Sequence, residues 1–326
     1  MDDIKLISDE IPQEVKKYNL KIKQLEVGKS GKVGILDVEL KENNELKTVI
    51  VKQFSQVPLQ IQRAVYPESS LPGMAYLYII SPSGGILQGD RYKTDITLKN
   101  NAVSHITTQG ATRIYSMNSN SASQLVNITL DENCYLEYIP DQIIPYQNSR
   151  YYQKVNLNIH DNATLIYSEV LTPGRTAMKE TFDYDICYLR TYCKNQNNEF
   201  RCLENMKIEP KKYNMKIKGI LGKYNIVGTV YVLTKKNQIE KLEEKIYEKI
   251  QKSELVSIGT SILPNEISSD FSIFSLIASS SFCNLLFFVK TYTVPTILYF
   301  PKTPFIFILY FLGSIFIFSK HLNLLF

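Results

Sequence analysis

Short apolar runs, in which β-branched and aromatic residues alternate with polar ones, fill the first 270 residues of the chain. The runs end at Gly, Pro, Asn or Ser, and this pattern is typical of β-strands. They recur roughly every ten to fifteen residues, which favours a mainly β fold over alternating βαβ units. The expected architecture is layered antiparallel or mixed β-sheets, as a β-sandwich or a β-coil, with a few helices. We expect strands at residues 33–39, 46–53, 74–80, 92–98, 104–108, 124–130, 134–139, 152–159, 164–171, 183–192, 215–219 and 224–233.

Three of these strands follow similar short segments. Each segment has an Asn or Asp turn, then a small residue, then the apolar strand, and the three begin at Lys99, Asp131 and His160. Their spacing of about 30 residues is a weak sign of stacked β-coils.

One segment has helical periodicity. Residues 238–252 place Ile239, Leu242, Ile246 and Ile250 on one face, and Glu and Lys fill the opposite face. We expect an amphipathic helix there, packed on a sheet, and a helix that binds a partner is the alternative.

The composition changes sharply after residue 270, so we divide the chain into a β-rich domain at 1–270 and a hydrophobic tail at 271–326. All 32 acidic residues lie at or before Asp270, and 12 of the 15 phenylalanines lie after it. Phe271–Val289 is uncharged and close to the length that crosses a bilayer. The tail is therefore either a membrane anchor or hairpin, or the product of a frameshift.

Charge and cysteine content exclude several classes. The formal net charge of +5 is mild and no basic stripe is present, which argues against nucleic-acid binding. Five cysteines without CxxC spacing argue against a zinc site. The N-terminus has no signal peptide, so we expect reduced thiols and a cytoplasmic location.

The most distinctive segment runs from Ser81 to Arg91. It contains Gly84, Gly85 and Gly89 and closes with the pair Asp90 and Arg91. Its spacing does not match the glycine patterns that bind phosphates, which favours a structural turn over a nucleotide site.

Acidic residues are the best candidates for chemistry, because no nucleophile motif is present. Asp90, Glu137, Asp141, Glu169 and Glu180 all lie in or beside distinctive segments. A pair such as Glu137 and Glu180 could serve acid–base catalysis, so a membrane-anchored β-sandwich hydrolase is our alternative interpretation.

Four ordered segments resemble motifs of the urease accessory protein UreD family, also called UreH. They are Gly84-Gly-Ile-Leu-Gln-Gly-Asp90, Thr107-Thr-Gln-Gly-Ala-Thr-Arg-Ile-Tyr115, Leu136-Glu-Tyr-Ile-Pro-Asp-Gln-Ile-Ile-Pro-Tyr146 and Gly174-Arg-Thr-Ala-Met-Lys-Glu-Thr-Phe182. Lys179 stands where the family usually has glycine, which puts the geometry of that turn in doubt. Weaker similarity extends from about residue 30 to about residue 265.

The resemblance implies a β-rich fold and a chaperone role, without enzymatic activity, in urease maturation. It implies binding to the urease structural subunits, to UreF and to the GTPase UreG, and a homodimer within that complex. It also implies that nickel passes through the protein, with no cofactor of its own, no catalytic residue and no tight metal site. Asp90, Thr108 and Glu180 are the expected lining of this passage, and the alternative is that they brace turns. The motif residues with expected structural roles are Gly84, Gly85, Gly89, Arg91, Gln109, Arg113, Glu137, Pro140, Pro145, Gly174 and Arg175.

The resemblance also bears on the tail. Members of the family continue after the segment that matches Gly259–Pro264 into a further soluble strand and a helix, whereas this chain becomes Phe-rich. A frameshift near residues 265–271 is therefore preferred over a membrane anchor.

Overall fold

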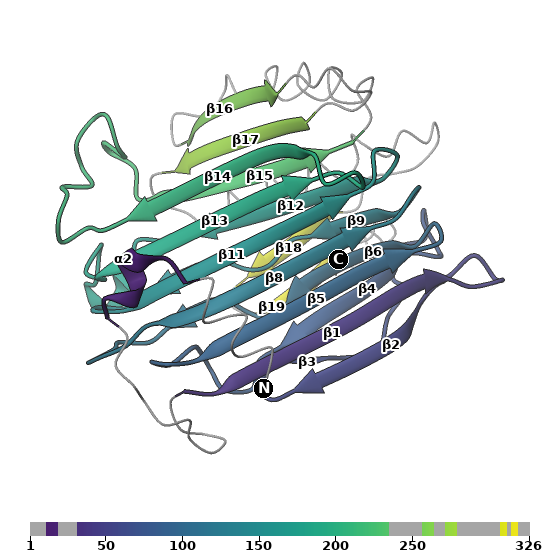
Figure 1. The fold of residues 1–326 in the computed structure, drawn as a ribbon, viewed down its shortest axis with the longest axis horizontal. Helices are drawn as coiled ribbons and strands as arrows, with labels where there is room; N and C mark the ends of the chain where they lie inside the picture. Colours follow the sequence, from purple (N-terminus) through teal and green to yellow (C-terminus); the bar gives the residue numbers. More distant parts are fainter. Residues whose placement is uncertain are drawn as a thin grey trace, which may run out of the picture.

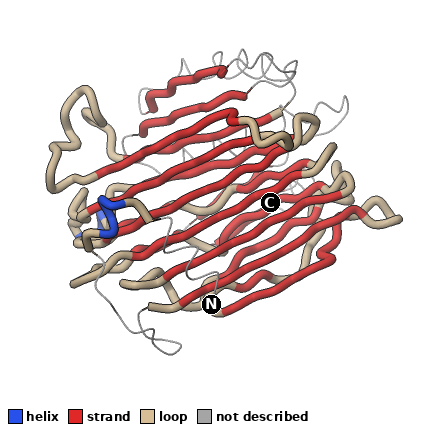
Figure 2. The backbone as a smooth tube through the Cα atoms, in the orientation of Figure 1, coloured by secondary structure: helices blue, strands red, loops and turns tan. Residues whose placement is uncertain are grey.

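A computed structural model describes residues 11–18 and 31–234, together with the strand backbones at 256–263, 271–278, 307–311 and 314–318. The helix expected at 238–252 lies outside the described residues. Figure 1 shows two large β-sheets stacked face to face with their strands roughly aligned, and Figure 2 shows how little of the described chain is helical. One short helix, α2 (Gln13–Lys16), and one 3-10 turn, η1 (Thr176–Met178), complete the described elements. The expectation of a mainly β fold with mixed sheets is confirmed.

The seven-stranded sheet has the order β14-β13-β11-β8-β5-β1-β2 in the described residues. Its strands are β1 (Val33–Glu42), β2 (Thr48–Gln56), β5 (Arg91–Lys99), β8 (Ala122–Leu130), β11 (Arg150–Ile159), β13 (Ile186–Lys194) and β14 (Phe200–Ile208). β5, β8, β11 and β13 run parallel to one another, whereas β2 and β14 are antiparallel edge strands.

The ten-stranded sheet has the order β16-β17-β15-β12-β9-β6-β4-β3, and two short strands pair off this path. Its strands are β3 (Gln60–Ile61), β4 (Ala75–Ile80), β6 (Val103–Thr108), β7 (Thr112–Ile114), β9 (Tyr135–Tyr138), β10 (Ile143–Pro145), β12 (Thr164–Leu171), β15 (Ile226–Leu233), β16 (Val256–Leu263) and β17 (Phe271–Ala278). β4, β6, β9 and β12 form a parallel ladder that mirrors the ladder of the other sheet.

Between β4 and β13 the chain alternates between the two sheets, so each pair of strands forms one turn of a β-coil. Successive turns stack through the two parallel ladders. The spacing of the Asn/Asp segments was a weak sign of this coil, and the structure shows that each segment forms the same corner of successive turns.

These corners are short turns of three or four residues, at 100–102, 131–134 and 160–163. Asn100, Asn101 and Asn133 adopt positive φ, which Asn tolerates better than most residues. The small residue that follows is buried in each case (Ala102, Cys134 and Ala163). Because this position is buried in each turn, a small side chain suits it, which accounts for the small residue in the repeat.

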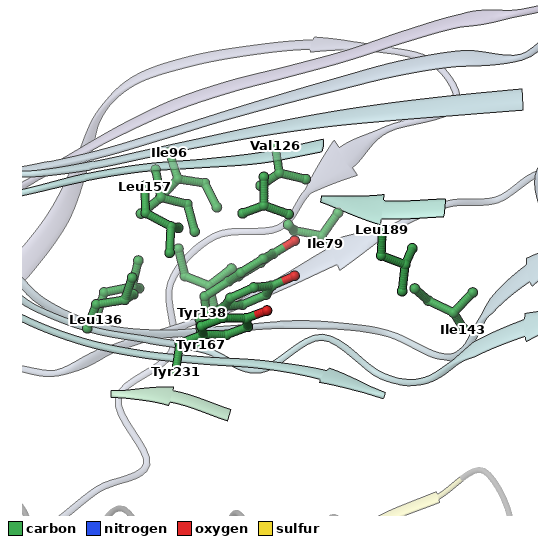
Figure 3. Packing of buried hydrophobic residues seen from close by; sticks show 14 of the residues in the cluster. Ile79, Ile96, Val126, Leu136, Tyr138, Ile143, Leu157, Tyr167, Leu189 and Tyr231 are labelled. Carbon is green, nitrogen blue, oxygen red and sulfur yellow. The ribbon is translucent and has the colours of Figure 1, made fainter. Parts of the chain in front are cut away.

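The core lies between the two sheets. Inward positions of both ladders are mainly apolar, as alternation along a strand requires, and Gln124, Gln153 and Glu169 are polar exceptions. Within it, the Tyr138, Tyr167 and Tyr231 rings stack across β9, β12 and β15, with centroids 5.7 and 5.2 Å apart (Figure 3). Their hydroxyl groups point the same way, so three polar groups lie on one side of the ring stack within a mainly apolar core.

One expected strand is not formed, and several observed strands were not expected, among them β3, β7, β10, β14 and β16. Residues 215–219 form turns rather than a strand, because Met215 and the later Leu221 are buried as anchors of a long loop. Conversely, β14 was not expected. Four of its nine residues are polar or charged, and the apolar Phe200 and Leu203 are exposed, because it is an edge strand with a solvent-facing side.

The backbone of the tail enters the fold at its start. β17 pairs antiparallel with both β15 and β16, and β18 (Phe307–Phe311) pairs with β19 (Ser314–Phe318). In the described part of the chain, none of the helices has the length and apolarity required to cross a membrane. The division at residue 270 stays a prediction.

Candidate functional site

The four family-like motifs meet at one end of the β-coil. The connections that lead from the ten-stranded to the seven-stranded sheet are ten to fourteen residues long, at 81–90, 109–121, 139–149 and 172–185, and we call them the long connections. They lie together at the end of the coil opposite the Asn turns, at the left in Figure 1. Each motif lies wholly or largely within one of them, so segments about 90 residues apart in sequence form one surface.

Backbone hydrogen bonds join the long connections in sequence order. The Ile86 amide donates to the Arg113 carbonyl (2.8 Å), and the Tyr115 amide donates back to Ile86 (2.9 Å). β7 then pairs with β10, and the Thr172 amide donates to the Ile143 carbonyl (3.0 Å). The motifs therefore specify how neighbouring coils close at this end.

Two glycines are needed for this closure. A Cβ on Gly85 would lie 2.4 Å from the Tyr115 ring and 2.7 Å from the Arg113 carbonyl. Gly174 has a φ of +128°, and its position lies against the Glu180 and Pro145 carbonyl oxygens. Both glycines permit a close backbone approach that other residues would prevent.

Asp90 braces the first long connection. Its carboxylate is fully buried and accepts hydrogen bonds from the amides of Gly31 (3.0 Å), Lys32 (2.9 Å) and Leu87 (2.9 Å) and from the Tyr92 hydroxyl (3.1 Å). The Lys32 ammonium lies 3.9 Å away. A carboxylate with this many donors is held in place, and both of its oxygens already accept hydrogen bonds from the protein.

Arg91 extends the brace to the next coil. Its guanidinium donates to the Asp90 and Ser121 carbonyl oxygens, at 2.9 and 2.6 Å. Burial lowers the pKa of Arg91 to about 10, and the charge of Asp90 opposes this shift. The Asp-Arg pair therefore does both: Asp90 closes the turn that begins at Leu87, and Arg91 links this connection to the next one.

Arg175 and Glu180 form an ion pair in the last connection. Arg175 binds both carboxylate oxygens of Glu180, and its guanidinium lies 4.0 Å from the centre of the Tyr146 ring. Hydrogen bonding by Arg175 lowers the pKa of Glu180, and the Gln147 amide contributes in the same direction. Lys179 has a φ of 63°, so the turn keeps the left-handed conformation that suits the family's usual glycine.

A cavity of about 300 Å³ lies beside the first two motif segments. Gly84, Gly85, Gln109, Thr112 and Arg113 contribute to its wall from the long connections. Strand residues complete the lining at the edge of the core, among them Tyr92, Thr108, Gln124 and Tyr138.

A smaller cavity of about 30 Å³ continues toward the core. It shares Thr108, Thr112, Gln124 and Tyr138 with the larger cavity and adds Asp141, Gln153, Tyr167 and Glu169. This volume accommodates a water molecule, and its lining offers several polar partners. The two cavities are adjacent, since they share four lining residues, and we call the pair, which reaches from the long connections to Glu169, the polar path.

Glu169 is the most perturbed carboxyl group along this path. It accepts hydrogen bonds from Gln153 Nε2 (2.6 Å) and from the Tyr167 hydroxyl (2.8 Å). Burial raises the pKa of Glu169 to about 7, although these two hydrogen bonds oppose the shift. The group therefore changes protonation near neutral pH, which is typical of a functional carboxyl group.

The three residues expected to line a passage occupy different environments. Thr108 lines both cavities, and its hydroxyl accepts a hydrogen bond from the Asp141 amide (2.8 Å). Asp90 and Glu180 line neither of these two cavities, and both are engaged in the contacts described above. Their assignment to a passage stays a prediction, and the contacts favour the bracing alternative.

The carboxylate pair of the hydrolase alternative is not supported. Glu137 lies on the outward side of the ten-stranded sheet, where it contacts His105 Nδ1 (2.7 Å) and the Tyr135 hydroxyl (2.6 Å). Glu180 is bound to Arg175 in a long connection. In the residues that the structure covers, no group of three or more His, Cys, Asp or Glu side chains is arranged to hold a metal ion.

Sequence reasoning noted Glu169 but did not select it as a passage residue. It also missed Gln124 and Gln153. The available signal was alternation: in β12 Glu169 occupies the same inward register as Leu165 and Tyr167, where an apolar residue is expected. A charged residue at a core-facing position is unusual enough to mark a site.

The fold and this site define a β-coil scaffold protein whose long connections surround a polar path. Residues 32–282 match the family model described as UreD urease accessory protein. The chain belongs to the UreD urease accessory protein family.

Individual relatives agree with this assignment. The chain is 50% identical over 241 residues to the urease accessory protein UreD of Cenarchaeum symbiosum, which covers 74% of this chain and 84% of that protein. It is 37% identical over 256 residues to UreD 2 of Brucella canis, covering 78% and 84%. It is 33% identical over 255 residues to UreD of Yersinia pseudotuberculosis, covering 78% and 79%.

Proposed function

We propose that this protein is a urease maturation chaperone that binds the urease apoprotein and, with UreF and UreG, supports nickel insertion into urease. The protein acts in the cytoplasm, within a complex that contains two copies of the chain. Membership of the UreD family supports the role in urease maturation.

The observation that carries the nickel step is the polar path that ends at Glu169. Thr108, Asp141 and Glu169 supply hydroxyl and carboxyl oxygens along it. Nickel is the cargo, and oxygen groups of this kind bind a divalent cation with lower affinity than clustered thiolates or imidazoles do. A carboxyl group with a pKa of about 7 can exchange its proton for a passing cation near neutral pH.

Complementation of a strain that lacks this gene tests the proposal. Glu169→Gln removes the negative charge but keeps the shape, so we expect urease activation to fall at least tenfold. Glu137→Gln is the matched control, because Glu137 is equally buried but lies outside both cavities. Equal activation by the two variants would remove nickel passage from the proposal. Nickel-dependent rescue by the wild type separates a metal role from a simple interaction module.

Affinity capture from cells that express the urease operon tests the partners. The tagged full-length chain should retain the urease subunits together with UreF. If it retains neither, the assignment to urease maturation fails.

The origin of the tail is open to a direct measurement. We propose that a frameshift near residues 265–271 produced the Phe-rich tail. The absence of acidic residues after Asp270 supports this, whereas the family match extends to residue 282. Intact-mass measurement of the native protein decides the question. A mass that matches all 326 residues contradicts the frameshift.

A further inference from the structure

The loop between β14 and β15, residues 209–225, is the most prominent projection of the described chain. It extends beyond the strand ends at the same side of the molecule as the long connections (Figure 1). Lys211 bonds to Asp185 (2.6 Å) in the last long connection, and the Lys216 ammonium lies 5.8 Å from the Phe182 ring. The loop is therefore attached to the end of the coil where the motifs meet.

Two buried side chains fix the shape of this loop. Met215 and Leu221 are only 7% and 6% exposed and belong to the main core cluster. Between them, the Leu221 amide donates to the Met215 carbonyl (3.2 Å), and the Ile220 amide donates to Ile217 (2.8 Å). The residues around these anchors are consequently held in a defined arrangement.

Three apolar side chains of the loop point into solvent. Tyr213, Ile217 and Ile220 are 58%, 53% and 42% exposed. Single exposed apolar residues are ordinary, but three of them on one anchored loop are typical of an interaction surface. An aromatic residue beside aliphatic ones is also the usual composition of an interface centre.

The same loop is strongly basic. It contains five lysines and one acidic residue, Glu209. Lys211 and Lys212 are paired with carboxylates, whereas Lys218 and Lys223 are exposed and form no ion pair with the described residues. The three exposed apolar side chains therefore share the loop with Lys218 and Lys223, whose positive charges no carboxylate of the described residues neutralises.

We infer that this loop docks onto a protein surface that presents carboxylates around an apolar depression. Tyr213, Ile217 and Ile220 enter the depression, and Lys218 and Lys223 face the carboxylates. The inference rests on the proposed function, because the partner is a protein component of the urease assembly. The loop contacts the last long connection, so the docked partner lies at the same end of the coil as the four motifs.

Affinity capture from cells expressing the urease structural subunits, UreF and UreG tests this inference with the full-length chain. Lys218→Glu/Lys223→Glu and Ile217→Ser/Ile220→Ser remove the charged and the apolar contributions separately. Lys41→Glu/Lys47→Glu is the matched control, because it changes the charge equally at exposed positions in the β1–β2 hairpin. Thermal unfolding verifies that all variants are folded.

We expect both loop variants to retain at least tenfold less of one partner, while the control retains as much as the wild type. Wild-type retention should also fall as salt rises, because exposed charges are screened. If the wild type captures partners and the loop variants capture them equally well, the inference fails and the proposed function stands. If the wild type captures no partner, both fail.

One further arm separates a protein from a lipid surface. Vesicles of phosphatidylglycerol and phosphatidylcholine are sedimented with the wild type and with Lys218→Glu/Lys223→Glu. The inference predicts little sedimentation of either. Strong sedimentation of the wild type that the variant loses, with partner capture unchanged, assigns the loop to a membrane and overturns the inference.

Discussion

The two ends of the β-coil close the same strands in different ways. At one end, turns of three or four residues return the chain directly from one sheet to the other. At the opposite end, connections of ten to fourteen residues carry the four motifs, the buried Asp90, the Arg175–Glu180 pair and the two cavities. Because both ends join the same two ladders, closure of the coil alone cannot require the longer connections.

The difference teaches where the constraints on this chain lie. A short turn needs a residue that accepts positive φ and a small residue behind it, and several sequences satisfy that. The long connections need particular side chains, because each one is bonded to the next. We expect substitutions at the two ends to separate stability from function.

The largest expected effect comes from Asp90→Ala. The change leaves three buried amides and a buried hydroxyl without their acceptor, so stability should fall by about 3–5 kcal/mol. Asp131→Ala at an Asn turn is the control, because Asp131 is exposed and its loss should cost less than about 0.5 kcal/mol. Denaturant unfolding measures both. Similar losses at the two positions would show that the brace does not stabilise the fold.

A smaller, pH-dependent effect is expected from Glu169→Gln. The pKa of Glu169 is raised from 4.5 to about 7 in the folded protein. Between these values the folded state keeps a proton that the unfolded state has lost, so wild-type stability falls as pH rises from 4.5 to 7 and then levels.

The glutamine variant has no such dependence. It should therefore be more stable than the wild type at pH 8, by on the order of 1–3 kcal/mol, with the advantage vanishing near pH 4.5. Thermal unfolding across this pH range measures the difference. A constant difference would mean that Glu169 is not the titrating group. Greater stability combined with lost urease activation would make Glu169 a functional rather than a structural residue.

The smallest effect should come from Lys179→Gly. Lys179 holds a φ of 63°, which is strained for a side chain with a Cβ, so glycine should stabilise the protein by about 0.5–1 kcal/mol. Asn133→Gly at the opposite end also replaces a positive-φ residue, but Asn already tolerates that conformation. Its change should be close to zero. A stabilised Asn133→Gly variant would contradict this account of the turns.

Much of the architecture could be predicted from the sequence. Alternation located most strands of both ladders, and the repeated Asn/Asp segments were a weak sign of stacked coils, with a β-sandwich as the alternative. β14 could not be predicted, because an edge strand with polar residues on its solvent side lacks a clear apolar pattern. The strand predicted at residues 215–219 was wrong, although its sequence alternates. Its apolar residues do not share one buried face, because Met215 is buried in the core whereas Ile217 is exposed on the loop.

The candidate site was less predictable. The motifs identified Thr108, which lines both cavities, but also Asp90 and Glu180, which line neither. A sequence motif shows which residues belong together. It does not show whether one of them stabilises a turn through hydrogen bonds or lines a cavity. That distinction depends on which groups meet across coils, about 30 residues apart.

The sequence by itself determined the family, the strand content and the β-coil period, because these follow from local alternation and from ordered motifs. The tertiary structure decided that the four motifs share one end, that Asp90 is saturated with donors and that Glu169 lies at the end of a polar path. The physical reason is that hydrogen-bond saturation and desolvation depend on neighbours that only the stacking of successive coils brings together.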